Sequence, residues 1–599
     1  MLDVDELTDG QLLSKLDEQL DALPGVKRNR EAMSSSSRQQ GGEQATAPAA
    51  AAAASARQPT SSGKPGARGV VLNEEQEDAR LVLAAGKSLN LVGKAGTGKT
   101  LVEEEFAAMT YDAEGDKAAL LWCAPNNSQV QDCKRRAFKN AKLCAVTHGG
   151  KRIRTAASVF KLPLHGLANG KKMAIEMNAG FKEVCRKPNF KLIINEASGL
   201  SPHKRMAISE CLQELRKDNR PDGGAQVLDA HDPGQNKPML NKAEIENVKG
   251  MAKVGPKWEL MIEAPIMQPG QRETRFLTKV QRFKEALYQD GCSAMRLGNV
   301  DKNVVKLVQV TEAREFSEAE DLAAQTIYGT TAEVMERNLE AAPRRAAQLG
   351  LTVANGGAWL FDAKAQFPER QELQDYSEGE LNAVRSYGLE KQFFYKGARV
   401  LVVQKAPMAD TEDDGEDEDC IFDMGDDSLR FDDGAYATGN MPGEVIGWVE
   451  GEYLEVRVDH RPSNADKLKI SVRNYTAYVG DKEVTVPLVG VKPEQERVVD
   501  LAQGLEWDGP VHVVATNLRG PAKLYVAMTR ARRLSDLKLT GVEPTFRGVR
   551  QVLRSNWRFL HWLKQMGQPL PVASAAYATK CKEEYDCAFG GGSGAAMRC

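Results

Sequence analysis

Residues 89–101 read LNLVGKAGTGKTL and join a short apolar run to a segment of helical composition. Gly93, Gly98, Lys99 and Thr100 have the spacing GxxxxGK(S/T), which is typical of a phosphate-binding loop between a strand and a helix. Glycines allow backbone amides to surround phosphates, the lysine can reach the β and γ phosphates, and the threonine hydroxyl can bind Mg²⁺. The alternative is a plain Gly-rich turn. We predict a nucleotide site formed by Gly93, Gly96, Thr97, Gly98, Lys99 and Thr100.

Four apolar segments near this loop have the length of buried strands and alternate with longer helical segments. They read SLNLVG (88–93), AALLWCAP (118–125), FKLIINEA (190–197) and GGAQVLDA (223–230). Buried strands that alternate with helices predict a parallel sheet in an α/β fold. A second series begins after about residue 275. It is interrupted by GEVIGWVEGEYLEVRVDH (443–460), whose period-two alternation predicts a small antiparallel barrel inserted into the second α/β unit.

Charge is unevenly distributed along the chain. The formal net charge of the 599 residues is −3, but thirteen acidic residues and one arginine lie between Asp410 and Asp433. The remainder of the chain is therefore mildly basic, which is compatible with a nucleic-acid partner. We interpret the acidic run as a solvated insertion in a loop, and competition with a bound polyanion is the alternative.

The N-terminal region differs in composition from the rest. Residues 9–23 predict a short acidic amphipathic helix that can bind a protein partner, and a linker rich in Ser, Ala, Gly and Pro follows. We find no apolar run of membrane-spanning length and no secretory leader, and the ten cysteines show no paired spacing. We therefore expect a soluble intracellular protein with no membrane partner, and the basic residues 27–30 (KRNR) favour the nucleus.

A second chemical signal lies in KLIINEASGLS (191–201). Glu196 follows an apolar strand, where a carboxylate can polarise the water that attacks a nucleotide. The alternative for Glu196 is an acidic residue favoured by a helix N-terminus. Asn195 stands where an aspartate would normally hold Mg²⁺ through its charge, so we expect metal affinity or turnover to be weakened. The predicted metal-binding residues are Thr100 and Asn195.

The order of motifs between about residues 72 and 545 resembles the Pif-type, RecD-like branch of superfamily 1 DNA helicases. The phosphate-binding loop and LYVAMTRARR (524–533) are close matches to that family. Partial matches are LNEEQ (72–76), CAPNNSQV (123–130), TAASVFKLPL (155–164), GGAQVLDAHDPGQNKP (223–238), RFLTKVQRFKEAL (275–287) and VVDLAQGLEWD (498–508).

This resemblance implies an α/β P-loop NTPase with two RecA-like parallel-sheet domains and a small SH3-like β-barrel insertion. It also implies ATP and Mg²⁺ as cofactors and single-stranded or forked DNA as the partner. By resemblance, Gln76 would contact the adenine, and the catalytic residues would be Lys99, Glu196, Gln235 and the arginine fingers Arg282 and Arg530. The implied DNA contacts are Asn126, Asn127, Phe160 and Gln503.

The corresponding boundaries divide the chain into six parts. These are an acidic helix with a disordered linker (1–68), the first RecA-like domain (69–274), the first part of the second (275–395), the β-rich insertion with the acidic run (396–495), the second part of the second domain (496–565) and a flexible tail (566–599).

The implied activity is that of an ATP-hydrolysing DNA helicase or translocase, moving 5′ to 3′ on single strands in DNA replication, repair, recombination or telomere maintenance. Departures from the family pattern occur at Asn195, Phe160, His231, Asp500 and Leu501. They leave open an alternative, a helicase-like protein that binds nucleotide and nucleic acid with little or no unwinding. An RNA-directed helicase of the same superfamily is a third possibility.

Overall fold

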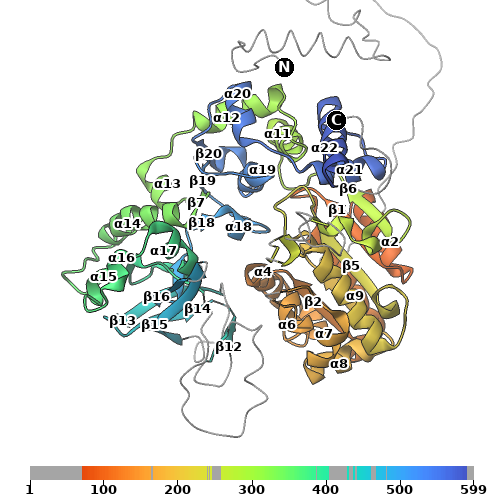
Figure 1. Cartoon of the computed structure of the whole chain (residues 1–599), viewed down its shortest axis with the longest axis horizontal. Helices are drawn as coiled ribbons and strands as arrows, with labels where there is room; N and C mark the ends of the chain where they lie inside the picture. The colour runs from red at the N-terminus through yellow and green to blue at the C-terminus, as the bar shows by residue number, and fades with distance from the viewer. Residues whose placement is uncertain are drawn as a thin grey trace, which may run out of the picture.

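The computed structural model describes residues 71–589 apart from 164–165, 239, 242, 246–257, 386, 404–427, 431–435, 439–440, 460–466 and 480–481. The predicted acidic helix at 9–23, the linker after it, most of the acidic run and residues 590–599 lie outside the described residues. The described part forms two lobes with parallel sheets and one antiparallel insertion (Figure 1).

The first lobe is built around a six-stranded parallel sheet in the order β3-β2-β4-β5-β1-β6. Its strands are β1 (Leu89–Gly93), β2 (Leu120–Ala124), β3 (Ile153–Thr155), β4 (Lys191–Ile194), β5 (Gln226–His231) and β6 (Glu273–Leu277). Its main helices are α2 (Glu74–Ala84), α3 (Lys99–Glu114), α4 (Asn127–Phe138), α5 (Ala141–Val146), α6 (Ala156–Phe160), α7 (Gly170–Glu176), α8 (Ala179–Arg186) and α9 (Pro202–Arg216).

Separate apolar cores lie on the two faces of this sheet. One contains Phe106 of α3 and Trp122 of β2, and the other contains Leu121 of β2 and Ile208 of α9. Successive residues of a strand point to opposite faces, so both faces of β2 are buried. This explains the uninterrupted apolar run of these strands in the sequence and confirms the predicted α/β layer.

The second lobe contains a four-stranded parallel sheet in the order β18-β7-β19-β20. Its strands are β7 (Gln325–Tyr328), β18 (Glu496–Val498), β19 (Val511–Val514) and β20 (Leu537–Thr540). The helices around it are α11 (Ala286–Arg296), α12 (Lys302–Glu312), α13 (Glu318–Ala323), α14 (Thr331–Gln348), α18 (Val499–Ala502), α19 (Lys523–Met528) and α20 (Phe546–Val552). The second predicted α/β unit is therefore confirmed.

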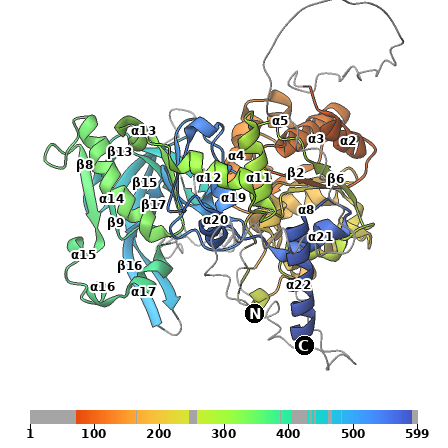
Figure 2. The same cartoon turned by 90° about the horizontal axis from the view of Figure 1, so that it is seen from above.

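The chain between α14 and β18 forms the insertion, which contains a six-stranded antiparallel sheet in the order β16-β15-β14-β13-β10-β17. Its strands are β10 (Arg399–Val402), β13 (Met441–Val449), β14 (Tyr453–Val458), β15 (Lys467–Val479), β16 (Lys482–Val489) and β17 (Val491–Pro493). Two smaller strand pairs, β8 (Ala358–Asp362) with β9 (Lys391–Tyr395) and β11 (Ser428–Arg430) with β12 (Tyr436–Thr438), accompany it, as do α15 (Ala363–Gln366), α16 (Glu372–Asp375) and α17 (Glu378–Val384). Figure 2 shows the second lobe between the first lobe and the insertion, and in Figure 1 the second lobe lies above both.

Two predicted boundaries differ from the structure. β6 pairs with β1, so the first sheet extends beyond residue 274. The tail predicted to be flexible from residue 566 contains a helix, α22 (Val572–Phe589), whose sequence has no Gly or Pro to interrupt it. The preceding helix, α21 (Trp557–Gln565), buries Phe559 and Trp562 in a cluster with Val92 of β1. α21 therefore packs on β1 of the first lobe, while Ser574 of α22 donates to the carbonyl oxygen of Leu297, which follows α11 of the second lobe, at 3.0 Å.

Candidate functional site

The phosphate-binding loop lies at the carboxyl edge of the first sheet, between β1 and α3. Gly96 and Gly98 have φ angles of +77° and +82°, in the left-handed region that favours glycine. Neighbouring groups also leave no room for a side chain, because a Cβ atom at Gly93 would lie 2.5 Å from Thr97 Oγ1 and one at Gly96 would lie 2.7 Å from Arg282 Cβ. The loop is therefore a close-packed turn that requires glycine at these positions.

Lys99 and Gln76 both bind the loop itself. Lys99 Nζ donates to the carbonyl oxygen of Gly93 at 2.9 Å. Gln76 Nε2 donates to the carbonyl oxygen of Thr97 at 3.0 Å, and its Oε1 accepts from the backbone N–H of Asn73 at the start of α2. Gln76 therefore supports the loop through both ends of its amide, whereas its predicted contact with adenine stays a prediction.

Glu196 and Asn195 follow β4 at the same edge of the sheet. Glu196 has a φ of +48°, which is uncommon for a residue other than glycine, and its Oε2 is buried without a hydrogen-bond partner. Such outliers concentrate at functional sites, and the open oxygen can accept a hydrogen bond from a water. Asn195 Nδ2 donates to Cys133 Sγ of α4 at 3.1 Å.

A second polar group follows β5. Gln235 is buried with no partner for its Oε1, and its Nε2 donates to Asp232 Oδ2 at 3.4 Å. Asp232 accepts from Arg296 Nε at 2.8 Å and from the Tyr525 hydroxyl at 3.0 Å. Burial alone would raise the pKa of Asp232, but the charges of Arg296 and Lys99 hold it below its ordinary value. Asp232 is therefore ionised, and its hydrogen bonds with Arg296, Tyr525 and Gln235 hold it in place.

His231 stands where the resemblance would place a glycine. Its ring is completely buried, and Nε2 is hydrogen-bonded to Asn90 Oδ1 of β1 at 2.5 Å. Burial lowers the pKa of His231 to about 4, so the ring is neutral at neutral pH. The histidine in place of the family's glycine is therefore accommodated by a hydrogen bond between β5 and β1, and it adds no charge beside Asp232.

Arg282 connects the loop to the second lobe. The backbone N–H groups of Gln281 and Arg282 donate to the carbonyl oxygen of Gly96 at 2.8 and 3.2 Å. The Arg282 guanidinium forms an ion pair with Glu506 at 2.6 Å and donates to the carbonyl oxygen of Thr529 at 3.2 Å. The predicted arginine finger therefore lies against the phosphate-binding loop.

Arg530 is almost completely buried, at 2% exposure. Its guanidinium donates to the carbonyl oxygens of Val526 and Leu505 and to Thr529 Oγ1, each at 2.7 Å, and to the carbonyl oxygen of Ala502 at 3.3 Å. All four of these acceptors are neutral. Burial and the nearby charge of Arg282 lower the pKa of Arg530 to about 10, and Glu196 opposes this shift. Arg530 is thus a buried cation that acts on both Arg282 and Glu196 and is suited to an anionic ligand.

Gln503 and Gly504 bring the second lobe close to Glu196. A Cβ atom at Gly504 would lie 3.3 Å from Gln129 Cγ and 3.6 Å from Glu196 Cγ. Gln503 is buried, and its Nε2 has no partner. The two lobes therefore meet at the residue predicted to activate water.

The three DNA contacts predicted in the first lobe differ in exposure. Asn126 and Asn127 are partly exposed at the start of α4, where Asn126 Oδ1 accepts from the backbone N–H of Gln129 at 3.0 Å. Phe160 is 0% exposed and belongs to the apolar core that contains Ile208. The predicted DNA contact at Phe160 does not fit this structure, because α6 directs the ring into the core and leaves no exposed face for a base.

Sequence reasoning missed Tyr525, Asp232 and Arg296 as site residues. The backbone N–H of Ala95, inside the phosphate-binding loop, donates to the Tyr525 hydroxyl at 3.0 Å, and that hydroxyl donates to Asp232. Tyr525 is 1% exposed and belongs to α19 of the second lobe. It lies in the same motif as Arg530, but a buried aromatic residue on a helix is indistinguishable from a core residue by pattern alone.

The residues at this edge fit a nucleoside triphosphate and Mg²⁺. The loop offers backbone amides and Lys99, and Thr100 is the second residue of α3. Glu196 Oε2 and Gln235 Oε1 are buried acceptors without partners. No group of three or more His, Cys, Asp or Glu side chains is arranged for a metal among the described residues, so Mg²⁺ would depend on phosphate oxygens and few protein ligands.

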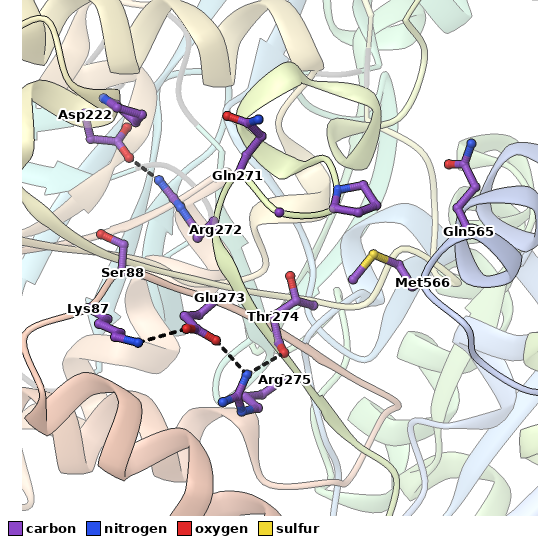
Figure 3. A pocket seen from close by; sticks show the side chains of 13 residues that line it. Lys87, Ser88, Asp222, Gln271, Arg272, Glu273, Thr274, Arg275, Gln565 and Met566 are labelled. Atoms are coloured by element: carbon purple, nitrogen blue, oxygen red, sulfur yellow. Dashed lines mark hydrogen bonds and ion pairs between the residues drawn. The ribbon is translucent and has the colours of Figure 1, made fainter.

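A cavity of about 750 Å³ lies at the opposite edge of the first sheet (Figure 3). Ser88 precedes β1, Glu273 begins β6 and Asp222 precedes β5, so the cavity is at the amino ends of these strands. Its charged side chains pair with one another, Lys87 and Arg275 with Glu273 and Arg272 with Asp222. Ligands of open α/β sheets bind at the carboxyl ends, so this cavity is not the nucleotide site.

No protein-family model and no curated protein matches the sequence. Solved Pif1 helicases match the structure. One structure, of two coordinating Pif1 helicases at forked dsDNA, gives a TM-score of 0.55 at 17% identity and covers 83% of this chain and 97% of that chain. Pif1 from Candida albicans gives 0.52 at 17% identity, covering 83% and 100%, and Bacteroides Pif1 with ADP-AlF3 and ssDNA gives 0.53 at 17% identity, covering 83% and 97%. The chain therefore shares the fold of these solved Pif1 structures.

Proposed function

We propose that this protein is an ATP-dependent motor that translocates on single-stranded DNA and unwinds forked DNA. This proposal is supported by the hydrogen bonds that join the phosphate-binding loop to Arg282 and to Tyr525 of the second lobe, and Arg282 to Thr529 of that lobe. Pif1 structures with this fold include complexes with forked dsDNA and with ADP-AlF3 and ssDNA, which supports a nucleotide and DNA as ligands here.

In this proposal hydrolysis depends on closure of the lobes. Lys99 would contact the phosphates and Glu196 would orient the attacking water, while Arg282 and Arg530 would stabilise charge on the transferred phosphoryl group. Mg²⁺ held with Thr100 would neutralise negative charge on the phosphate oxygens. Because Lys99 and Arg530 belong to different lobes, they act together only when the lobes are close, so each hydrolysis cycle can move a bound strand.

The proposed DNA path crosses the carboxyl edges of both lobes, where Asn126, Asn127 and Gln503 are found. Contacts with the DNA backbone and stacking on bases tolerate any sequence, so we expect no base-specific recognition. Movement from 5′ to 3′, a role in DNA replication, repair, recombination or telomere maintenance, and placement in the nucleus extend the proposal. Among the residues that the structure describes, no helix has the length and apolar character to cross a bilayer.

ATP hydrolysis by the full chain with Mg²⁺, measured with and without single-stranded DNA, tests the proposal. We expect DNA to stimulate turnover and Lys99→Ala to abolish it. Lys87→Ala is the matched control, because Lys87 is an exposed lysine that pairs with Glu273 at the other edge of the sheet and should keep full turnover. Wild-type turnover no higher than that of Lys99→Ala, despite DNA binding, would contradict the motor.

A second candidate is a protein that binds nucleotide and DNA with little hydrolysis. Two observations favour it. Asn195 offers an amide to Cys133 instead of a carboxylate to a metal, and Asp500, which departs from the family pattern, forms an ion pair with Lys523. The same assay separates the candidates, because a pure binding protein would retain DNA affinity without turnover.

A further inference from the structure

Glu103 of α3 is a buried carboxylate that the proposed reaction does not use. It is 0% exposed. Its Oε2 accepts from Trp122 Nε1 at 3.1 Å, and its Oε1 has no hydrogen-bond partner. The charged groups that act on it are Glu196, Lys99 and Arg136, two of which belong to the predicted catalytic set. Glu103 is therefore an open acceptor next to the nucleotide site.

The position of Glu103 relates it to both predicted metal-binding residues. It follows Thr100 by three positions in α3, and residues three apart lie on the same side of a helix. Asn195 approaches from the sheet, where its backbone N–H donates to Cys123 of β2 at 2.8 Å. Cys133, which accepts from Asn195 Nδ2, is also within reach of the Glu103 charge. Thr100, Asn195 and Glu103 thus border one region behind the loop.

A structural role as the acceptor for Trp122 uses one carboxyl oxygen of Glu103 and leaves the other buried without a partner. Burial and the nearby charge of Glu196 raise the pKa of Glu103 to about 8, so without a cation beside it the carboxyl is mostly protonated at neutral pH. A glutamine of the same size would accept from Trp122 equally well. A glutamate differs from that glutamine in being able to ionise when a cation binds beside it, and the nearby position where a carboxylate would face the metal holds Asn195 instead.

We propose that Glu103 supplies the negative charge toward Mg²⁺ that Asn195 cannot supply, and so acts as a positioning residue for the metal at Thr100. A divalent cation beside it stabilises the ionised carboxylate. The inference rests on the proposed function, because it presupposes a nucleotide and Mg²⁺ at the loop. In this proposal the carboxylate that faces the metal comes from Glu103 of α3 instead of from the residue after β4, where this chain has Asn195.

The test uses the full chain with Mn²⁺ as a paramagnetic probe of the Mg²⁺ site. Electron paramagnetic resonance measures Mn²⁺ binding in the presence of ADP, and calorimetry measures ADP affinity without metal. Glu103→Gln keeps the size and the acceptor for Trp122 and removes the charge. We expect Mn²⁺ to bind about tenfold more weakly, as for outer-shell partners of other metals, with unchanged metal-free ADP affinity.

Two further variants make the test specific. Glu104→Gln changes the next residue of α3, which forms an ion pair with Arg136, and should leave Mn²⁺ affinity unchanged. Asn195→Asp introduces a carboxylate after β4, at the other residue predicted to face the metal. In the double variant Glu103→Gln with Asn195→Asp, Mn²⁺ affinity should therefore return close to the wild-type value.

Three outcomes would overturn the inference: unchanged Mn²⁺ affinity in Glu103→Gln, no recovery in the double variant, or loss of metal-free ADP binding, which would indicate a structural role. If the wild-type chain binds neither ADP nor Mn²⁺, the proposed function fails and the inference fails with it. If the wild type binds both and Glu103→Gln changes nothing, only the inference fails.

Discussion

Gly96 of the phosphate-binding loop is subject to two constraints, a left-handed backbone and crowding by a neighbouring side chain. Gly96 and Gly86 have nearly equal φ angles, +77° and +76°. Only Gly96 is also crowded, since a Cβ there would meet Arg282, whereas nothing lies within 4 Å at Gly86. An alanine at either position costs about 1 kcal/mol for the left-handed backbone. We therefore expect Gly96→Ala to lower ADP affinity, measured by calorimetry, because it also displaces Arg282 from the loop.

Gly86→Ala is the control for that experiment. It should lower the free energy of unfolding by about 1 kcal/mol and leave ADP affinity unchanged. Equal ADP affinities in the two variants would show that crowding at Gly96 does not matter to the site.

Arg282 provides a second test at this scale. An arginine that stabilises charge on a transferred phosphoryl group contributes about 10³-fold or more to turnover. Arg282→Ala should lower DNA-stimulated ATP hydrolysis by about that factor while ADP still binds, because Lys99 and the loop amides remain. Arg533→Ala, at an exposed arginine of the second lobe, should hydrolyse ATP at the wild-type rate. Loss of ADP binding by Arg282→Ala would assign the residue to loop structure instead of turnover.

The sequence identifies residues whose role depends on local spacing. Lys99 and Thr100 are defined by their place in the loop, and Glu196 by the strand before it. Tyr525 and Asp232 act through a contact between residues 293 positions apart, which no local pattern contains. Phe160 shows the opposite error, because an aromatic residue in a motif has the same appearance whether it faces the core or a ligand.

At the scale of elements, strands were predictable and final packing was not. A parallel strand is buried on both faces, so β1 and β2 are continuous apolar runs that the sequence displays directly. An amphipathic helix displays an apolar face but not the surface that covers it. This is why α21 could be expected near the end of the chain, while its packing on Val92 of the first lobe could not.

The packing of α21 leads to a prediction about stability. Trp562 is 2% exposed within the cluster that contains Val92, Phe559 and Leu563. Removing a buried tryptophan ring leaves a cavity, so Trp562→Ala should lower the free energy of unfolding of the first lobe by about 3–5 kcal/mol. Urea unfolding followed by circular dichroism measures this change. Leu349→Ala removes a side chain that is 63% exposed and should change the midpoint little, and equal midpoints for the two variants would contradict the packing.

At the scale of the whole molecule, polar contacts around the nucleotide site join the two lobes. Arg282 pairs with Glu506, Lys94 Nζ donates to Ser293 Oγ at 2.9 Å, and Tyr525 bridges Ala95 and Asp232. The phosphate-binding loop, Asp232 and Arg282 thus contact side chains of the second lobe. A nucleotide that binds this loop must act on the same contacts, which gives a physical route from the site to lobe movement.

Tyr525 tests that route, because its hydroxyl both accepts from a loop amide and donates to a buried carboxylate. Tyr525→Phe keeps the ring in the core of the second lobe and removes only the hydroxyl. The Ala95 amide and one Asp232 oxygen then lose a partner, which costs about 1–3 kcal/mol. We expect the nucleotide-free protein to unfold at a lower urea concentration, and ADP to restore part of the difference because phosphates engage the loop amides. Tyr478→Phe, at a 70% exposed tyrosine of β15, is the control and should unfold like the wild type. A Tyr525→Phe midpoint equal to that of Tyr478→Phe would show that the hydroxyl does not hold the lobes together.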